Sequence, residues 1–579
     1  MLLGARMGRP VQYDDQDSRE VEKLSLTSPD RNKSNNMEKA EDSTLSEVDL
    51  EAGASTEQLE NRNGSNNNNT NSDVTDNANG NSKVLMRLET VPDIKRDTSG
   101  ITTQYITAGI VNLGAFAAGV CIAWSSSALL TTTTEMYPDQ ESDVIRNQTE
   151  THPKLMMSPI EASWVSSLLC LGAVWGAVPT GLISENFGRK KTLLYLALPL
   201  LVSWILVASS PNVYGLYVGR FVGGVAVGAF SVGIPPYIED IAERHLLPTL
   251  ANFYHVHFSC GVLFGYICGL VNSTSWLCFL SASVPVAFFV AFIFIPESPA
   301  YLLSQGKNSE AKAALQYFRG IDNDVKAELK ALKEHTLNYA KNRVTFKELF
   351  TTRTNVKALI VSFGLMIFQQ LSGIYPVLFY AEKLFKTFSI SLTPPGASII
   401  LGFCLVSSTY FSTMLLKKVR RRVLLLFSFL MMSVSLGSLG LYYHFKASNG
   451  SINSTWIPLF TLCTFVSVYA AGVGPIPWLM LREIFPPHVT RRATAITVGF
   501  HWFLAFGVTK LYQNLVNMVH PGWALWHFAV SSIVGAIFVY FFVPETKGKT
   551  LEDIQNEFDG IHKGKKHRHV IELESISEG

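Results

Sequence analysis

The stretch PETKGKTLEDI, residues 544–554, has a shorter counterpart in PESP, residues 296–299. Each stretch follows a long apolar run, and the two are separated by about 240 residues. Two other pairs of short charged motifs recur with about the same separation. These further pairs are Gly188-Arg189-Lys190 with Arg420-Arg421-Arg422, and Asp240 with Glu483. Matching signals at matching helix ends predict two halves of six membrane spans each, as in porters built from parallel repeats.

The composition is that of a membrane protein. Of 579 residues, 47% are hydrophobic and only 16% are charged, whereas an average soluble protein has about 25% charged residues. Because a helix of about 20 apolar residues spans a bilayer, the apolar runs predict an all-α membrane protein with twelve transmembrane helices in two six-helix bundles. The expected spans are residues 104–130, 161–183, 192–209, 213–234, 250–271, 275–295, 355–382, 396–416, 422–445, 456–481, 492–516 and 523–543.

The polar segments divide the chain further. Residues 1–100 carry 12 basic and 19 acidic residues and include the stretch SNNNNTNSDVTDNANGNS. Such a composition buries too little apolar surface to offset the entropy of ordering, so it predicts disorder. We expect five segments: a disordered cytoplasmic tail (1–100), an N-terminal six-helix bundle (101–295), a cytoplasmic helical linker (296–354), a C-terminal six-helix bundle (355–543) and a cytoplasmic tail (544–579).

Basic loops predict the orientation in the membrane. An excess of Lys and Arg marks cytoplasmic loops, and GRKK (188–191) and KKVRRR (417–422) fall on one side of a twelve-span count. Both termini are then cytoplasmic, and the chain is expected to be a multi-pass protein of the plasma membrane. Glycosylation needs a sequon on the other side. The candidate sites are Asn147, Asn449 and Asn453.

Several function classes lack their motifs in this sequence. There is no P-loop, no nucleophile–base constellation and no metal-binding box, so neither an enzyme nor a cofactor is expected. The seven cysteines lie in or beside apolar runs without a CxxC pair, which is typical of small buried hydrophobes. His255 and His257 face apart on a helix and do not form a metal pair. The expected partners are a small solute and the lipid bilayer, not nucleic acid; partners of the tails stay open.

Five strings resemble the sugar-porter branch of the major facilitator superfamily over residues 104–555. They are GLYVGRFVGGVAVG (215–228), PESPAYLL (296–303), QQLSGIYPVLFY (369–380), GVGPIPWLMLREIFP (472–486) and PETKGKTLEDI (544–554). Within that branch the chain is most similar to the trehalose and glucose facilitators. The resemblance implies the major facilitator fold and facilitated diffusion of a sugar, trehalose or a hexose, by alternating access. The alternatives are a divergent porter for another small polar solute and a sugar sensor with little transport.

The resemblance also implies a set of substrate-binding residues. Amides both donate and accept hydrogen bonds, as a polyhydroxylated solute requires, and Gln369 and Gln370 match the sugar-binding glutamines of that branch. One of the pair is expected to face the cavity, while the other reaches a neighbouring helix. Trp478 and Trp502 match its aromatic positions.

Other substrate positions depart from the pattern of that branch. Amides are replaced at His255, Tyr375 and His501, and less securely at Leu405. Tyrosine is much larger than asparagine, so a disaccharide has less room beside Tyr375. The two histidines are candidates for substrate hydrogen bonding or pH sensitivity; the alternative is a neutral histidine with satisfied bonds.

Charged residues at the helix ends are candidates for gating. In that branch such residues latch one end of the transporter shut, and the candidates here are Glu185, Arg189, Arg220, Asp240, Arg421, Glu483 and Arg491. Leu247 and Thr490 stand where the pattern has arginines, which predicts a weaker latch. Residues 104–130 contain no carboxylate. Proton-coupled members of the branch carry one there, so passive facilitation is expected.

Overall fold

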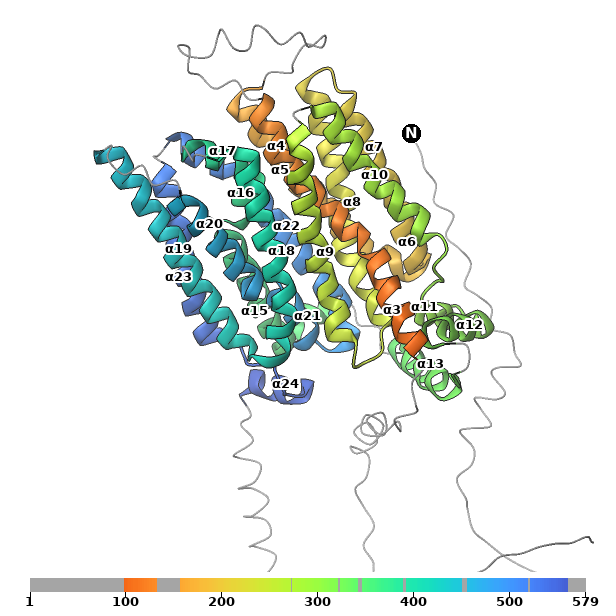
Figure 1. Cartoon of the computed structure of the whole chain (residues 1–579). Coiled ribbons are helices and arrows are strands. Elements are labelled where there is room, and N and C mark those ends of the chain that lie inside the picture. Colours follow the sequence, from red (N-terminus) through yellow and green to blue (C-terminus); the bar gives the residue numbers. More distant parts are fainter. Residues whose placement is uncertain are drawn as a thin grey trace, which may run out of the picture. The chain divides into compact units, whose positions relative to one another are not determined.

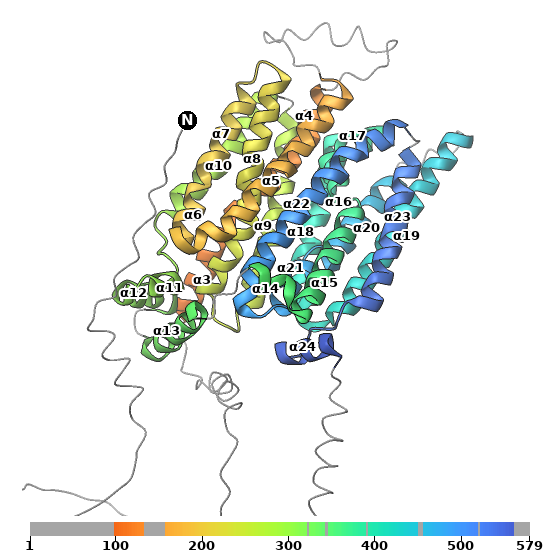
Figure 2. The ribbon, with the colours of Figure 1, turned by 180° about the vertical axis from the view of Figure 1, so that it is seen from behind.

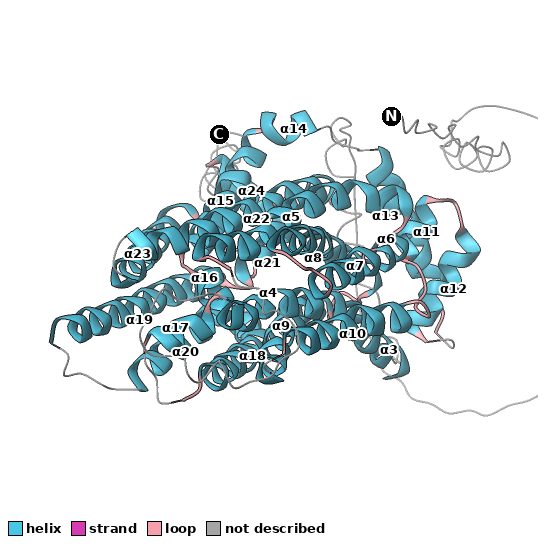
Figure 3. Cartoon of the chain, turned by 90° about the horizontal axis from the view of Figure 1, so that it is seen from above, coloured by secondary structure: helices cyan, strands magenta, loops and turns pink. Residues whose placement is uncertain are grey.

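The computed structural model describes residues 98–132, 157–271, 273–320, 323–341, 346–388, 392–449, 456–518 and 521–560. Residues 1–97 and 561–579 of the two predicted tails lie outside these ranges, as do the candidate glycosylation sites Asn147 and Asn453 and the side chain of Asn449. The described residues form helices joined by short connections and no strands (Figure 3).

Twelve helices or helix pairs are long and apolar enough to cross a membrane, which confirms the predicted number. The first six spans are α3–α4 (Thr98–Val111, Leu113–Thr132), α5 (Pro159–Phe187), α6–α7 (Arg189–Tyr195, Ala197–Ala208), α8 (Val213–Ile241), α9 (Leu247–Cys268) and α10 (Thr274–Phe292). The second six are α15–α16 (Arg353–Leu371, Ile374–Phe379), α18 (Pro394–Lys418), α19 (Arg421–Asn449), α20–η3–α21 (Trp456–Val468, Tyr469–Val473, Ile476–Glu483), α22 (Pro487–Met518) and α23 (Pro521–Phe542).

Shorter helices accompany the spans. The linker forms α11 (Pro299–Ser304), α12 (Asn308–Arg319), α13 (Lys326–Lys341) and α14 (Phe346–Thr351); α17 (Ala381–Thr387) continues the seventh span, and α24 (Leu551–Asp559) follows the twelfth. Figures 1 and 2 show α11 to α13 and α24 at one end of the molecule. That end also carries the loops 188–191 and 417–422, and we call it the basic end.

Four spans are divided where a continuous helix was expected, and two of these breaks lie beside the central cavity. Gly373 adopts a left-handed conformation, with φ of 84°, and separates α15 from α16. In the tenth span, the π-helical turn η3 and residues Gly474 and Pro475 separate α20 from α21. Irregular backbone at membrane depth survives where protein groups or a cavity satisfy its polar atoms. Both breaks border the cavity described below.

One span extends beyond its predicted end. The helix α8 was expected to stop at residue 234, yet it continues through Pro235 and Pro236 to Ile241. Prolines lack the amide hydrogen and weaken a helix interior, but Tyr237 just beyond them is fully buried and donates a hydrogen bond to the carbonyl of Pro296 at 2.7 Å. Tertiary packing therefore holds the last turn of α8 against the local preference.

Each half of the chain packs as its own bundle, and the two bundles meet along two seams. Within the bundles the largest interfaces are α5 with α8, α4 with α9 and α19 with α23. Between the bundles, α22 packs along α5 and α18 along α9. The central cavity lies between these two seams.

Candidate functional site

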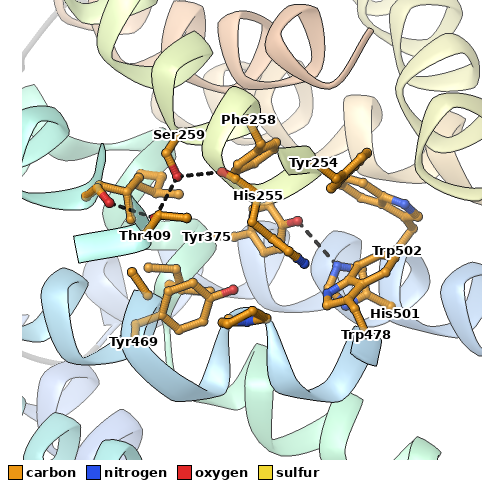
Figure 4. Close-up of a pocket in the computed structure, with 16 residues that line it drawn as sticks. Tyr254, His255, Phe258, Ser259, Tyr375, Thr409, Tyr469, Trp478, His501 and Trp502 are labelled. Atoms are coloured by element: carbon orange, nitrogen blue, oxygen red, sulfur yellow. Dashed lines mark hydrogen bonds between the residues drawn. The ribbon is translucent and has the colours of Figure 1, made fainter. Parts of the chain in front are cut away.

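A cavity at the interface of the two bundles contains most of the predicted substrate residues (Figure 4). It encloses about 640 Å³ of empty space, including the part that opens outward. The lining residues are Tyr254, His255, Phe258, Ser259, Ile374, Tyr375, Leu378, Leu405, Thr409, Tyr469, Ala470, Gly474, Pro475, Trp478, His501 and Trp502. Both bundles contribute to it.

Aromatic rings crowd one wall of this cavity around His501. Its ring centroid lies 5.1 Å from that of Trp478, 5.3 Å from Trp502 and 5.9 Å from Tyr375. His255 joins the group through Trp478 at 6.1 Å. Such rings can cover the C–H faces of a solute, while their nitrogen and hydroxyl groups bond its polar atoms.

Gln369 does not line the cavity; it supports the break in the tenth span. Its side chain is fully buried, and its amide nitrogen donates to the carbonyls of Val473 at 2.7 Å and Gly474 at 3.1 Å. Helix breaks free such carbonyls, and within a membrane they need a protein partner. Gln369 thus satisfies two backbone carbonyls that a continuous helix, as expected from the sequence, would not have left free.

Gln370 is also fully buried and is held by His501. Its amide nitrogen lies 3.0 Å and 3.1 Å from the two ring nitrogens of His501. The hydroxyl of Tyr375 lies 3.3 Å from His501 Nε2. The expectation that one glutamine faces the cavity is therefore not met in this conformation, because backbone carbonyls and an imidazole engage the amide nitrogens of both residues.

A second cavity connects the central one to the basic end. It encloses about 1,030 Å³ of empty space, including its open part, and shares Tyr254, His255, Pro475 and Trp478 with the central cavity. Its other lining residues include Asn252 and Thr413, whose side chains bond one another at 2.6 Å, and the basic residues Lys417, Arg421, Arg482 and Lys547. The second cavity therefore lies between the central cavity and the basic end.

Comparison with known proteins identifies the family. The family described as Sugar (and other) transporter matches residues 110–558. The chain belongs to this family. This transporter is 34% identical over 464 residues to the "Facilitated trehalose transporter Tret1" of Polypedilum vanderplanki, covering 79% of this chain and 89% of that protein. It is 34% identical over 462 residues to the protein of the same name from Drosophila virilis, covering 79% of this chain but 49% of that longer relative.

A solved structure shows the same fold. The proton:xylose symporter XylE from E. coli, a major facilitator superfamily protein, matches with a TM-score of 0.62 at 24% identity, over 80% of this chain and 99% of that chain. At that identity the likeness concerns the fold alone. It confirms the expected major facilitator fold of two six-helix bundles.

In this transporter the repeated motifs of the two halves make equivalent contacts at the basic end. Arg189 pairs with Asp240, which also accepts a hydrogen bond from Ser298 at 2.7 Å. In the second half, Arg421 lies 3.2 Å from Glu483, which accepts a hydrogen bond from Thr546. Each motif therefore ties three helix ends together inside its own bundle. These four predicted gating residues do not join one bundle to the other.

The carboxylates of the two Pro-Glu motifs also act alike. Glu297 accepts a hydrogen bond from the backbone nitrogen of Lys190 at 2.7 Å, and Glu545 accepts one from that of Arg421 at 2.9 Å. Each glutamate thus satisfies a free amide at the start of a helix, where negative charge is favourable.

Two ion pairs join the bundles at the basic end. Arg491 lies 3.4 Å from Glu185, and both were predicted gating residues. Arg482 lies 2.8 Å from Glu239, and neither of these was predicted. The signal for the second pair was present, since each residue directly precedes a predicted gating carboxylate in the sequence.

Arg220, the remaining gating candidate, lies inside the first bundle. It donates to the carbonyl of Cys121 at 2.8 Å and to Ser125 at 2.6 Å, and it stacks over Trp124 at 5.0 Å. The structure does not bring it near the inter-bundle ion pairs.

We expect Glu239→Gln and Arg482→Gln each to lower the melting temperature, and the double variant to lose less than the sum of the two single losses, because both changes break the same ion pair. An exposed pair contributes about 0.2–1 kcal/mol, and their side chains are 36% and 24% exposed. The double variant should melt no lower than the less stable single variant, as measured on purified protein. Lys307 and Glu310, which pair within the linker, provide a control that should leave transport rates unchanged. Strict additivity for Glu239 and Arg482 would show that they do not interact.

The end opposite the basic end is held by two contacts that sequence reasoning missed. Glu382 of α17, whose side chain is 1% exposed, accepts a hydrogen bond from Ser127 of α4, and its backbone nitrogen donates to Ser126 at 3.0 Å. Lys510 of α22 donates to Ser163 of α5 at 2.7 Å and lies over the ring of Trp164. In each case a charged residue of the second bundle contacts uncharged residues of the first. A search of the sequence for oppositely charged partners could therefore not predict these contacts.

Proposed function

We propose that this protein carries a sugar across the plasma membrane by facilitated diffusion, through alternating access of its two bundles. The observation that carries the proposal is the central cavity. It lies between two repeated bundles, is lined by rings and hydrogen-bonding groups from both, and adjoins a second cavity on the side of the basic end. The names of the trehalose transporter relatives support a sugar as the solute.

Free polar groups in the cavity suit a hydroxylated solute. Among the residues that the structure describes, the hydroxyls of Tyr254 and Tyr469, the ring of His255 and the indole nitrogen of Trp478 line the cavity without a protein hydrogen-bond partner. A hydroxyl buried without a partner costs several kcal/mol. These four groups are the partners that a bound sugar would use, and Trp478 would also stack on its ring.

The orientation and segment boundaries form part of the same proposal. The basic end is cytoplasmic by the excess of Lys and Arg in its loops, which places both termini, the linker 296–354 and the tails 1–100 and 544–579 inside the cell. The conformation described here then opens inward through the second cavity. Its opposite end is closed by Glu382 and Lys510.

A second candidate is a porter for another small polar solute. The withdrawal of Gln369 and Gln370 from the cavity favours it, because fewer amide groups remain for a polyol.

The test is uptake of labelled glucose and trehalose by the purified full chain in proteoliposomes. We expect saturable uptake that reaches, but does not exceed, the external concentration when a pH gradient is imposed. A His255→Ala variant should raise KM about fivefold, the loss of one net hydrogen bond of about 1 kcal/mol, with little change in kcat. Its matched control is His444→Ala, an exposed histidine on α19. If neither glucose nor trehalose is taken up, the proposal is rejected and the second candidate remains.

A further inference from the structure

Gln370 lies behind the wall of the central cavity and is kept there by one neighbour. Its side chain is fully buried and contacts both ring nitrogens of His501, which is itself 1% exposed and lines the cavity. The carbonyl oxygen of its amide has no hydrogen-bond partner among the described residues. The imidazole therefore stands between an incompletely satisfied amide and the space that a solute would occupy.

Tyr375 completes the barrier and is fixed in place by its surroundings. It follows the break at Gly373, where a Cβ would lie 2.5 Å from the ring of Phe528, so the break itself is packed tightly against α23. The ring of Tyr375 lies 5.7 Å from that of Trp502, and the indole nitrogen of Trp502 donates to Ser231 of the other bundle at 3.2 Å. Tyr375 and His501 are therefore packed among neighbouring side chains, and neither can change rotamer without displacing those neighbours.

Beyond the four groups named above, few polar groups of the cavity are available to a solute. Ser259 and Thr409 bond one another at 3.0 Å and also bond backbone carbonyls of their own helices. A disaccharide carries more hydroxyls than a hexose and is about twice its size. Each hydroxyl that enters without a partner costs about 1–3 kcal/mol in a protein interior, and the barrier of Tyr375 and His501 also removes space.

From this geometry we infer that His501 and Tyr375 are specificity-determining residues, which hold Gln370 out of the cavity and thereby favour a hexose-sized solute over a disaccharide. The inference rests on the proposed function, because it concerns which sugar the same cavity accepts. It separates this chain from its relatives that are named for trehalose transport. Asparagine at position 501 would free the amide of Gln370, and asparagine at position 375 would open space in the cavity.

The experiment compares kcat/KM for labelled glucose and trehalose in proteoliposomes containing the full chain. The wild type should prefer glucose. His501→Asn, Tyr375→Asn and the double variant should each shift the glucose-to-trehalose ratio toward trehalose, by at least about fivefold in the double variant, which corresponds to about 1 kcal/mol. Because both sugars are measured on one sample, the ratio does not depend on how much protein folds. Tyr469→Phe, a change on another wall of the cavity, should lower both rates without changing the ratio.

The outcomes separate the inference from the proposed function. Saturable uptake of both sugars with an unchanged ratio in the double variant would overturn the inference and leave the function intact. A wild type that prefers trehalose would also overturn it. If neither sugar is transported by the wild type, and neither raises its melting temperature, both fail. If the asparagine variants do not fold, Tyr375→Phe keeps the ring, removes the bond to His501, and should produce a smaller shift in the same direction; no shift would count against the inference.

Discussion

A Gly228→Val variant is expected to yield about a tenth or less of the wild-type amount of folded protein, because overpacking at a backbone contact has no cheap relief. A Cβ at Gly228 would lie 2.0 Å from the carbonyl oxygen of Ala173 and 2.6 Å from its Cα. Both atoms belong to the backbone of α5, so neither can rotate away. The two helices would have to separate along the largest interface of the first bundle.

The matched control is Gly109→Val, because a Cβ at Gly109 meets nothing within 4 Å. Small residues permit close helix approach in membranes, so the same substitution should be damaging only where helices touch. Size-exclusion profiles of fluorescent fusions in mild detergent would measure the folded fraction of each variant. Equal yields for the two variants would mean that α5 and α8 do not cross at the described distance.

The twelve spans and the internal repeat could be predicted from the sequence because each depends on local features. Apolar length marks a span, and Glu297 and Glu545 mark equivalent helix ends whose contacts proved to be alike. Five of the sixteen residues that line the cavity were predicted as substrate residues: His255, Tyr375, Trp478, His501 and Trp502. All five lie on helix faces that the resemblance to the sugar porters assigns to the solute.

The roles of the two glutamines could not be predicted in the same way. Gln369 is needed by the carbonyls of Val473 and Gly474, and those carbonyls are free only because the tenth span breaks. Pro475 and Pro477 favour such a break locally, because proline lacks the amide hydrogen that a helix needs. Which side chain of another span satisfies the freed carbonyls depends instead on how the two spans pack. The position of Gln370 likewise depends on His501, 131 residues away.

Acidification of the side opposite the basic end is expected to hold that end closed, through Glu382. Burial raises the pKa of the Glu382 carboxyl from 4.5 to about 6, and the hydrogen bond from Ser127 opposes part of that rise. When this end opens, the carboxyl meets water and its pKa returns toward the ordinary value. The closed state therefore binds the proton more tightly, and its extra stability is complete below pH 4.5 and lost as the pH rises through 6.

The expected size follows from these two pKa values. Between pH 7.5 and pH 5 the ratio of closed to open protein should rise about eightfold by proton linkage. Opening can be measured by the labelling of Cys268 with a membrane-impermeant maleimide. Cys268 is only 5% exposed, and it lies close to Glu382, because a Cβ on the next residue, Gly269, would be 3.4 Å from that carboxyl.

The comparison with Glu382→Gln isolates the carboxyl from the thiol. Glutamine is neutral at every pH, so this variant should stay as closed as the protonated wild type, while the pH dependence of the thiol's own reactivity is common to both proteins. The labelling rate of wild type relative to Glu382→Gln should thus fall about eightfold from pH 7.5 to pH 5. Tyr266 faces the carboxyl from α9, but its hydroxyl donates to the carbonyl of Leu378 at 2.8 Å, and Lys383 on the same helix bonds Gln513. A relative rate independent of pH would therefore mean that Glu382 does not titrate with closure.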